Sequence, residues 1–167
     1  MGFRKPATQV WWKLMWLPAL YLAALATLGV AEGDLVAAAV LMVFVNTAIV
    51  GFSEELAFRG VLWGAARKAL LFWTGFLLVS AAFGSVHVFN AILTGELAGA
   101  GVQALNAFMS GAAYLAIRIR TRSIIPIMVI HALWDFTVFL VGSGGTPEPA
   151  TAAPDPDIWM TQLGFGL

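Results

Sequence analysis

The chain has 167 residues, of which 60% are apolar and only 11% charged, and its mean hydropathy is +0.88. A soluble domain of this size would struggle to stay monomeric in water with that balance, so we expect lipid to be the solvent. The absence of cysteine excludes disulfides, thiolate catalysis and cysteine-ligated zinc, and a formal net charge of zero gives no indication of nucleic-acid binding.

Five apolar segments are candidates for crossing the bilayer. A hydrocarbon core of about 30 Å requires roughly 20 helical residues. The predicted segments are 14–30, from 35 into the region of Arg67, 72–93, 98–117 and 124–141. We therefore predict an all-α fold, a polytopic integral membrane helical bundle with about five transmembrane helices.

The first segment has an alternative reading as a signal peptide. Arg4, Lys5 and Lys13 precede the apolar run, and the small residues Val30 and Ala31 follow near a cleavage point. The run is long for a signal, so a retained first span is favoured.

The basic residues indicate the orientation. Eight of the nine lie before the first segment, after the second or after the fourth, which is one side of a five-span chain. By the positive-inside rule the N-terminus is cytoplasmic and the C-terminal tail is outside. The predicted domain covers residues 1–141. Residues 142–167, rich in Pro, Gly and Ala, are predicted to form a flexible tail.

Ionisable residues inside a span are functional candidates, because they are unfavourable in lipid unless they face protein or water. In the second segment, Glu55 and Arg59 are four residues apart and can neutralise each other on one helix face. Glu54 then remains for chemistry as a general base. The alternative is a purely structural ion-pair network at the edge of the span.

Both histidines of the chain lie within predicted spans. Phe83 is one turn before His87, and Asp135 is one turn after His131, where it can fix the imidazole tautomer. Each histidine could instead serve only as a hydrogen-bonding group between helices.

Glu54 and His87 are equally distant from a predicted cytoplasmic turn beside Arg67 and Lys68. An antiparallel hairpin folded there would bring both residues to equal depth. The second helix must then be longer than a perpendicular span, so it is expected to tilt or break near Gly60.

In this order the motifs resemble those of the CAAX-protease and bacteriocin-processing (CPBP or Abi) family of intramembrane endopeptidases. The motif EExxxR corresponds to Glu54 through Arg59, FxxxH to Phe83 through His87, and HxxxN/D to His131 through Asp135. Each motif lies on a different apolar segment, and together they use both histidines.

The resemblance implies a cavity in the bundle where Glu54 and His87 activate water for peptide hydrolysis. It further implies that His131 stabilises the oxyanion with Asp135 as its partner, while Glu55, Arg59 and Phe83 support the site. Eukaryotic members cleave prenylated CAAX proteins and bacterial relatives are linked to peptide processing and immunity. The expected substrate is accordingly a hydrophobic or prenylated peptide or protein, and the expected location is a prokaryotic cytoplasmic membrane.

Other functions remain open from the sequence. The motifs HExxH and GxGD of two other intramembrane protease types are absent, and Ser143 follows both histidines, unlike the serine of a rhomboid. No cofactor is expected, since the family behaves as metal-independent, although the carboxylates and imidazoles could hold zinc or another divalent ion. The alternatives from other classes are a non-catalytic membrane regulator or immunity protein, and a small transporter with a Glu–His proton relay.

Overall fold

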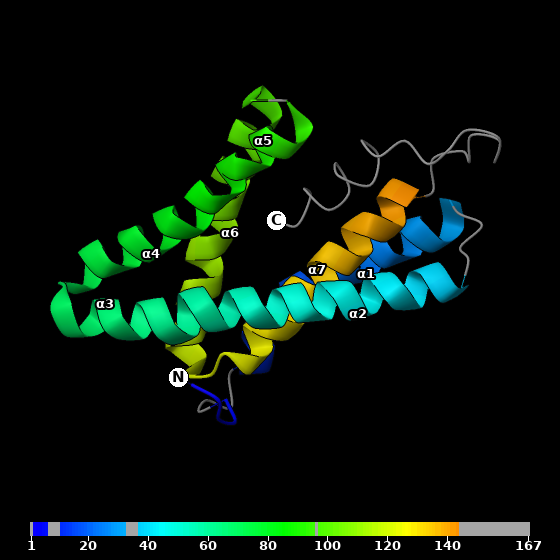
Figure 1. The fold of residues 1–167 in the computed structure, drawn as a ribbon. Helices are drawn as coiled ribbons and strands as arrows, with labels where there is room; N and C mark the ends of the chain where they lie inside the picture. The colour runs from blue at the N-terminus through cyan, green and yellow to red at the C-terminus, as the bar shows by residue number, and fades with distance from the viewer. Residues whose placement is uncertain (1, 7–10, 33–36, 96, 144–167) are drawn as a thin grey trace.

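The computed structural model describes residues 2–6, 11–32, 37–95 and 97–143, and all regular structure in these ranges is helical. The elements follow one another along the chain without a strand between them in the described part (Figure 1). They are α1 (Trp11–Glu32), α2 (Ala37–Glu55), the π-helical η1 (Leu56–Leu62), α3 (Trp63–Ala69), α4 (Phe72–Val86), the 3₁₀ turn η2 (His87–Phe89), α5 (Asn90–Thr94), α6 (Leu97–Thr121) and α7 (Ile125–Ser143).

These helices confirm the predicted polytopic bundle. Four helical stretches are long and apolar enough to cross a membrane, namely Lys13–Ala31, Ala37–Ala69, Phe72–Ile92 and Leu97–Thr121. The fifth predicted segment is the shorter apolar helix Ile125–Val141. The apolar side chains that point outward on all of these helices fit a bundle whose solvent is lipid.

The second segment forms one uninterrupted helical rod through α2, η1 and α3 (Figure 1). Of the two expected alternatives, a tilt or a break near Gly60, the continuous winding excludes the break. Gly60 instead lies buried inside the π-helical stretch, and the Trp63 N–H bonds to the carbonyl of Phe58, five residues back. A π-helical turn adds a residue to the winding and so changes which face the following turns present, and such turns are frequent at functional sites.

The rod ends where the sequence predicted a turn. Leu70 and Leu71 are extended, and α4 then runs back antiparallel. Phe58 contacts Phe83 across this hairpin, with ring centroids 5.1 Å apart. Figure 1 shows α4 leaving the rod at an angle, so the two arms separate with distance from the turn.

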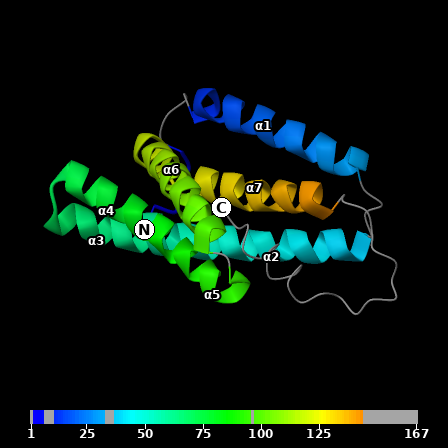
Figure 2. The ribbon, with the colours of Figure 1, turned by 90° about the horizontal axis from the view of Figure 1, so that it is seen from above.

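Helix α7 lies between α1 and the α2 end of the rod, while α6 packs on α4 and crosses the bundle (Figure 2). Two glycines permit close contacts. A Cβ at Gly51 of α2 would lie 2.8 Å from the backbone N of Ala132 on α7, and one at Gly84 of α4 would lie 2.7 Å from the Ala104 carbonyl oxygen on α6. Small residues of this kind let membrane helices approach closely.

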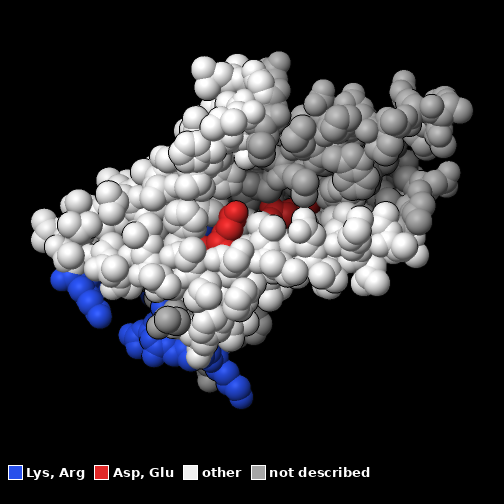
Figure 3. All heavy atoms as spheres, in the orientation of Figure 1, with Lys and Arg blue, Asp and Glu red and all other residues white. Residues whose placement is uncertain are grey.

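The lysines and arginines visible in Figure 3 gather along one edge of the molecule. The N-terminal residues are held at this edge by the turn between α6 and α7. Arg4 Nε donates to the Arg122 carbonyl at 2.9 Å, and Ser123 Oγ donates to the Arg4 carbonyl at 2.6 Å. The basic residues before α1 and after α6 thus lie together, as the charge pattern predicted. Helix α7 extends through Ser143, beyond the predicted start of the tail at residue 142, and residues 144–167 lie outside the described residues.

Candidate active site

The centre of the bundle contains a buried ion pair. Arg59 Nη1 donates to Glu55 Oε1 at 3.0 Å, and both side chains are 0% exposed. The pair is the one that the four-residue spacing predicts. Charges so deeply buried are tolerated only when they are paired and hydrogen-bonded.

Aromatic rings surround the rest of the guanidinium. Its central carbon lies 3.9 Å from the Phe83 ring centroid, 5.6 Å from that of Tyr114 and 5.9 Å from that of Phe58. A desolvated cation over an aromatic face is stabilised by about 2 kcal/mol or more. The phenylalanine of the second motif therefore packs against the arginine of the first motif, which joins α4 to the rod.

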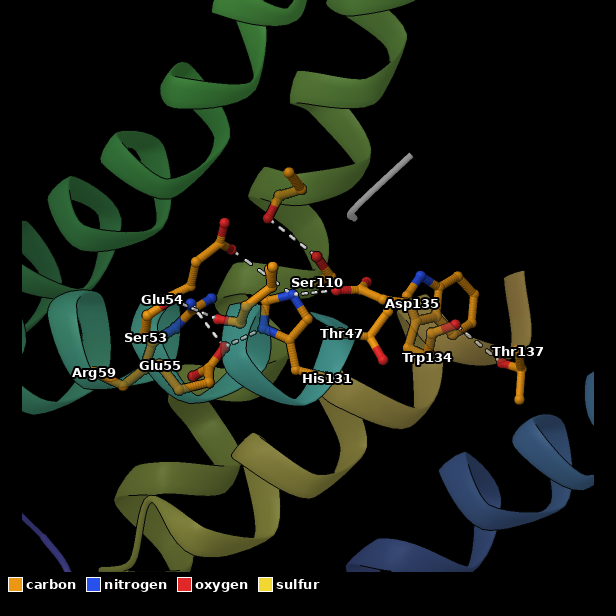
Figure 4. A network of polar contacts seen from close by, with 12 residues as sticks. Thr47, Ser53, Glu54, Glu55, Arg59, Ser110, His131, Trp134, Asp135 and Thr137 are labelled. Atoms are coloured by element: carbon orange, nitrogen blue, oxygen red, sulfur yellow. Dashed lines mark hydrogen bonds and ion pairs between the residues drawn. The ribbon is translucent and has the colours of Figure 1, made fainter. Parts of the chain in front are cut away.

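His131 on α7 lies among three carboxylates (Figure 4). Its Nδ1 is 2.9 Å from Glu55 Oε1, and its Nε2 is 3.5 Å from Asp135 Oδ2 and 3.7 Å from Glu54 Oε2. The imidazole is 0% exposed, whereas the Glu54 side chain is 30% exposed. Three predicted site residues therefore surround the His131 ring. Glu54 and Glu55 come from α2, and Asp135 comes from α7.

The short contact to Glu55 determines which nitrogen of the His131 ring carries the hydrogen. A carboxylate oxygen accepts, so Nδ1 carries the hydrogen and donates it to Glu55. Nε2 is then the nitrogen that faces Glu54 and Asp135. It is an acceptor in the neutral ring and a donor in the imidazolium.

His87 is 5% exposed at the junction of α4 and η2. Its Nδ1 is 2.8 Å from the Phe83 carbonyl oxygen, which can only accept, so Nδ1 carries the hydrogen. In the neutral ring, Nε2 is then the nitrogen that carries the lone pair.

The ring of Phe83 relates the two histidines. Its centroid is 5.0 Å from that of His87 and 5.9 Å from that of His131, with an edge-to-face arrangement in both cases. His87 follows Phe83 by one turn, just as Glu54 precedes Phe58 by one turn on the facing arm of the hairpin. The register of the hairpin thus places Glu54 and His87 at matching levels.

The surface at this level is hollowed. Figure 3 shows acidic side chains in a recess near the middle of the face, away from the edge that holds the basic residues. Among the three carboxylates around His131, the Glu54 side chain is the most exposed, at 30% against 0% for Glu55 and 5% for Asp135. A carboxylate in such a place can contact a substrate while its neighbours remain buried.

Two features of the site were not predicted from the sequence. Glu55 was expected to pair with Arg59 alone, yet the same carboxylate oxygen also accepts from His131. Tyr114 on α6 lies outside every motif, and its ring centroid is 5.5 Å from that of His131. Tyr114 is one of three polar side chains on the buried face of α6, with Gln103 and Thr121, and this polarity was the available signal.

In the described part of the chain, no group of three or more His, Asp or Glu side chains has the arrangement of a metal site. Within the site, Nδ1 of His131 is already engaged by Glu55 at 2.9 Å.

Comparison with known sequences adds one finding. Residues 36–137 match the protein family described as type II CAAX prenyl endopeptidase Rce1-like. The matched range covers more than half of the chain and includes all three motifs, from Glu54 to Asp135. The chain belongs to this family. Searches of curated proteins and of solved structures found no match.

Family membership identifies the protein as a CAAX-type membrane endopeptidase in the general sense, with several apolar helices in the bilayer. The matched range runs from the start of α2 into α7, so it contains every helix that carries a motif. Helix α1 lies outside the matched range.

Proposed function

We propose that the protein is an intramembrane endopeptidase that hydrolyses a peptide bond of a hydrophobic or prenylated peptide or protein, using a water molecule activated by Glu54 and His87. One observation supports this most strongly. His131 lies within 4 Å of Glu54 and Asp135, which come from different helices, and the ring of Phe83 bridges it to His87.

In the proposed reaction, Glu54 acts as the general base. The Glu54 carboxylate is partly exposed, at 30%. On the facing arm of the hairpin, Nε2 of the neutral His87 ring carries the lone pair. Glu54 removes a proton from water as the water oxygen bonds to the scissile carbonyl carbon, and Nε2 of His87 orients the water. The proton then passes to the amide nitrogen as the C–N bond breaks.

His131 and Asp135 are proposed to bind the oxyanion. Nε2 of His131 can donate to the developing charge when the ring is an imidazolium, which Glu55 supports by accepting from Nδ1. An ionised Asp135 accepts only, so it orients His131, whereas a protonated Asp135 would itself donate.

The reaction is proposed to be metal-independent, with no resident cofactor. The proposal is tested by chelation. A metal-dependent protease would lose activity in EDTA and regain it when zinc is added, whereas an enzyme that uses only carboxylate and imidazole would not respond.

We further propose that the N-terminus and the edge holding the basic residues face the cytoplasm of a prokaryotic cell, with the end of α7 on the opposite side. The hydrogen bond from Arg4 to the Arg122 carbonyl supports this orientation, and so does the gathering of basic residues along one edge in Figure 3. Labelling of single cysteines introduced at Lys68 and Gly95, in sealed vesicles, tests it, because the cysteine-free chain gives no background.

The catalytic roles are tested with purified protein in detergent and a library of apolar and prenylated fluorogenic peptides. Glu54→Gln and His87→Ala are expected to lower kcat by about 10²–10⁴, the contribution of a general base. Ser53→Ala is the matched control, because the Ser53 hydroxyl only bonds to the carbonyl of Val50 in its own helix. Normal cleavage by both Glu54→Gln and His87→Ala would overturn the assignment.

A second candidate is a non-catalytic membrane regulator or immunity protein. The buried contacts among Glu55, Arg59 and His131 favour this candidate, because they join the rod to α7. This structural role does not require hydrolysis. This alternative predicts that the wild-type protein cleaves no peptide of the library and that Glu54→Gln leaves its cellular effect unchanged.

A further inference from the structure

A pocket of about 690 Å³ lies between α1, α6 and α7. Its walls are largely apolar, with several polar groups from α6 and α7. The lining residues used below are Leu17 and Tyr21 of α1, Asn106, Ser110, Ala113 and Tyr114 of α6, and Trp134 of α7.

The pocket adjoins the third motif. Tyr114 contributes both to the pocket wall and to the surroundings of His131, with the two ring centroids 5.5 Å apart. Trp134, which also lines the pocket, directly precedes Asp135 in the chain. A molecule in the pocket would therefore pass within reach of the proposed oxyanion site.

The polar groups of the pocket are a donor and acceptor set of the kind that a peptide backbone needs. Ser110 donates to the Ala107 carbonyl at 3.1 Å, which leaves its oxygen able to accept. Asn106 can do both.

A second pocket of about 680 Å³ on the other side of α1 provides a contrast. Thr137 is its one residue with a polar side chain, and the hydroxyl already donates to the Trp134 carbonyl at 3.0 Å. An acyl chain of the bilayer would satisfy that second pocket completely. In the first pocket an acyl chain would leave polar groups unpaired, which is unfavourable in an apolar medium.

We infer that the pocket between α1, α6 and α7 is a substrate subsite that takes an apolar peptide segment on one side of the scissile bond. Apolar side chains of the segment would pack against Leu17 and the other aliphatic residues that line the pocket. Its backbone amides would pair with Ser110 and Asn106. The inference rests on the proposed endopeptidase function and adds the position of the substrate.

Helix α1 gives this subsite a feature of its own. It lies outside the range that matches the family, and its Tyr21 ring stacks on Trp134 with centroids 5.2 Å apart and an interplanar angle of 14°. At its other end, α1 approaches α7 closely, since a Cβ at Gly29 would lie 2.7 Å from the Cβ of Leu140. The pocket thus occupies the end where α1 and α7 are farther apart.

The experiment narrows the pocket without altering the proposed catalytic groups. Ala113→Trp places a large ring in the pocket. Ala116→Trp is the matched control, because Ala116 is also exposed on α6 but lines neither of the two pockets. With a fluorogenic peptide of Leu, Val and Ala residues, Ala113→Trp is expected to lower kcat/KM by about tenfold or more, chiefly through KM, and Ala116→Trp to match the wild type.

Equal kcat/KM values for the two tryptophan variants would overturn the subsite while leaving the endopeptidase function intact. Absence of cleavage by the wild type would instead overturn the proposed function. Thermal unfolding of both variants shows whether Ala113→Trp still folds.

Photo-crosslinking gives a readout that needs no turnover. The Glu54→Gln variant is irradiated with the same peptide carrying a benzophenone at its apolar end, and the labelled residues are identified by mass spectrometry. We expect labels near Leu17 and Ala113, and loss of these labels in Ala113→Trp. Labels confined to α4 and α5, or labels abolished by added phospholipid alone, would contradict a peptide subsite here.

Discussion

Replacement of Glu55 by glutamine separates structural from chemical effects at the centre of the site. The carboxylate accepts from Arg59 at 3.0 Å and from His131 at 2.9 Å through one oxygen, and all three side chains are fully buried. Glutamine keeps the shape and one acceptor oxygen but removes the charge. Both bonds then become ordinary neutral-acceptor bonds, and the guanidinium loses its counter-charge.

The loss of stability follows from these contacts. Weakening two charge-assisted hydrogen bonds removes about 2 kcal/mol, and a buried charge left without its partner raises the loss toward roughly 3–5 kcal/mol. For a chain of this length, the corresponding decrease in Tm is at least about 4 °C. Differential scanning fluorimetry in detergent measures it.

The loss of activity has a separate origin. Without the Glu55 charge, the imidazolium of His131 is less favoured and Nε2 is less able to donate to an oxyanion. We expect kcat to fall by about 10²–10³, as when one oxyanion donor is removed. Peptide cleavage at matched folded fraction measures this effect.

The double variant Glu55→Gln/Arg59→Met distinguishes the two effects. It removes both buried charges and keeps a long apolar side chain among the rings that surround Arg59, so most of the stability should return. Activity should not return, because His131 still lacks its carboxylate. Recovery of both properties together would refute the role given to Glu55, and so would full activity in Glu55→Gln alone.

Three further outcomes are expected. Asp135→Asn should stay active because an amide can donate to an oxyanion, whereas Asp135→Leu should lose about 10²–10³ in kcat in the same cleavage assay; equal rates would exclude a polar role for this residue. Gly111→Ala would bring a Cβ within 2.9 Å of Phe83 Cδ1 and 3.1 Å of Arg59 Nη2, so the unfolding free energy of this variant should be about 1–3 kcal/mol lower than that of the wild type. Thermal unfolding measures the difference, and Gly101→Ala is the control because its added Cβ has no atom within 4 Å. Phe83→Leu removes the ring that contacts both histidines and should lower kcat more than KM rises, with unchanged kcat as the contrary result.

Much of the fold was accessible from the sequence because it depends on local spacing. The length of each apolar run set the helices, and the four-residue separation of Glu55 and Arg59 set their ion pair. The turn at Leu70 and Leu71 lies where the basic residues indicated. In each case the relevant interaction is made within one helix or at its end.

Spacing along a helix could predict only some of the contacts in the candidate site. The His131–Asp135 contact follows from a one-turn separation on α7, whereas the level of His87 against Glu54 needed a hairpin of the correct register. The π-helical stretch around Gly60 was missed, because a long apolar helix carries no local signal for a change of winding.

The sequence by itself determined the membrane bundle and the one-turn partners of Arg59 and His131. Only the tertiary structure decided that Glu55 serves Arg59 and His131 together, and that Tyr114 and α1 enclose a pocket beside them. The physical reason is geometric. Spacing along a helix fixes which residues share a face, but the rotation of each helix and its lateral neighbours are set by packing between residues far apart in the chain, here 76 positions in the case of Glu55 and His131.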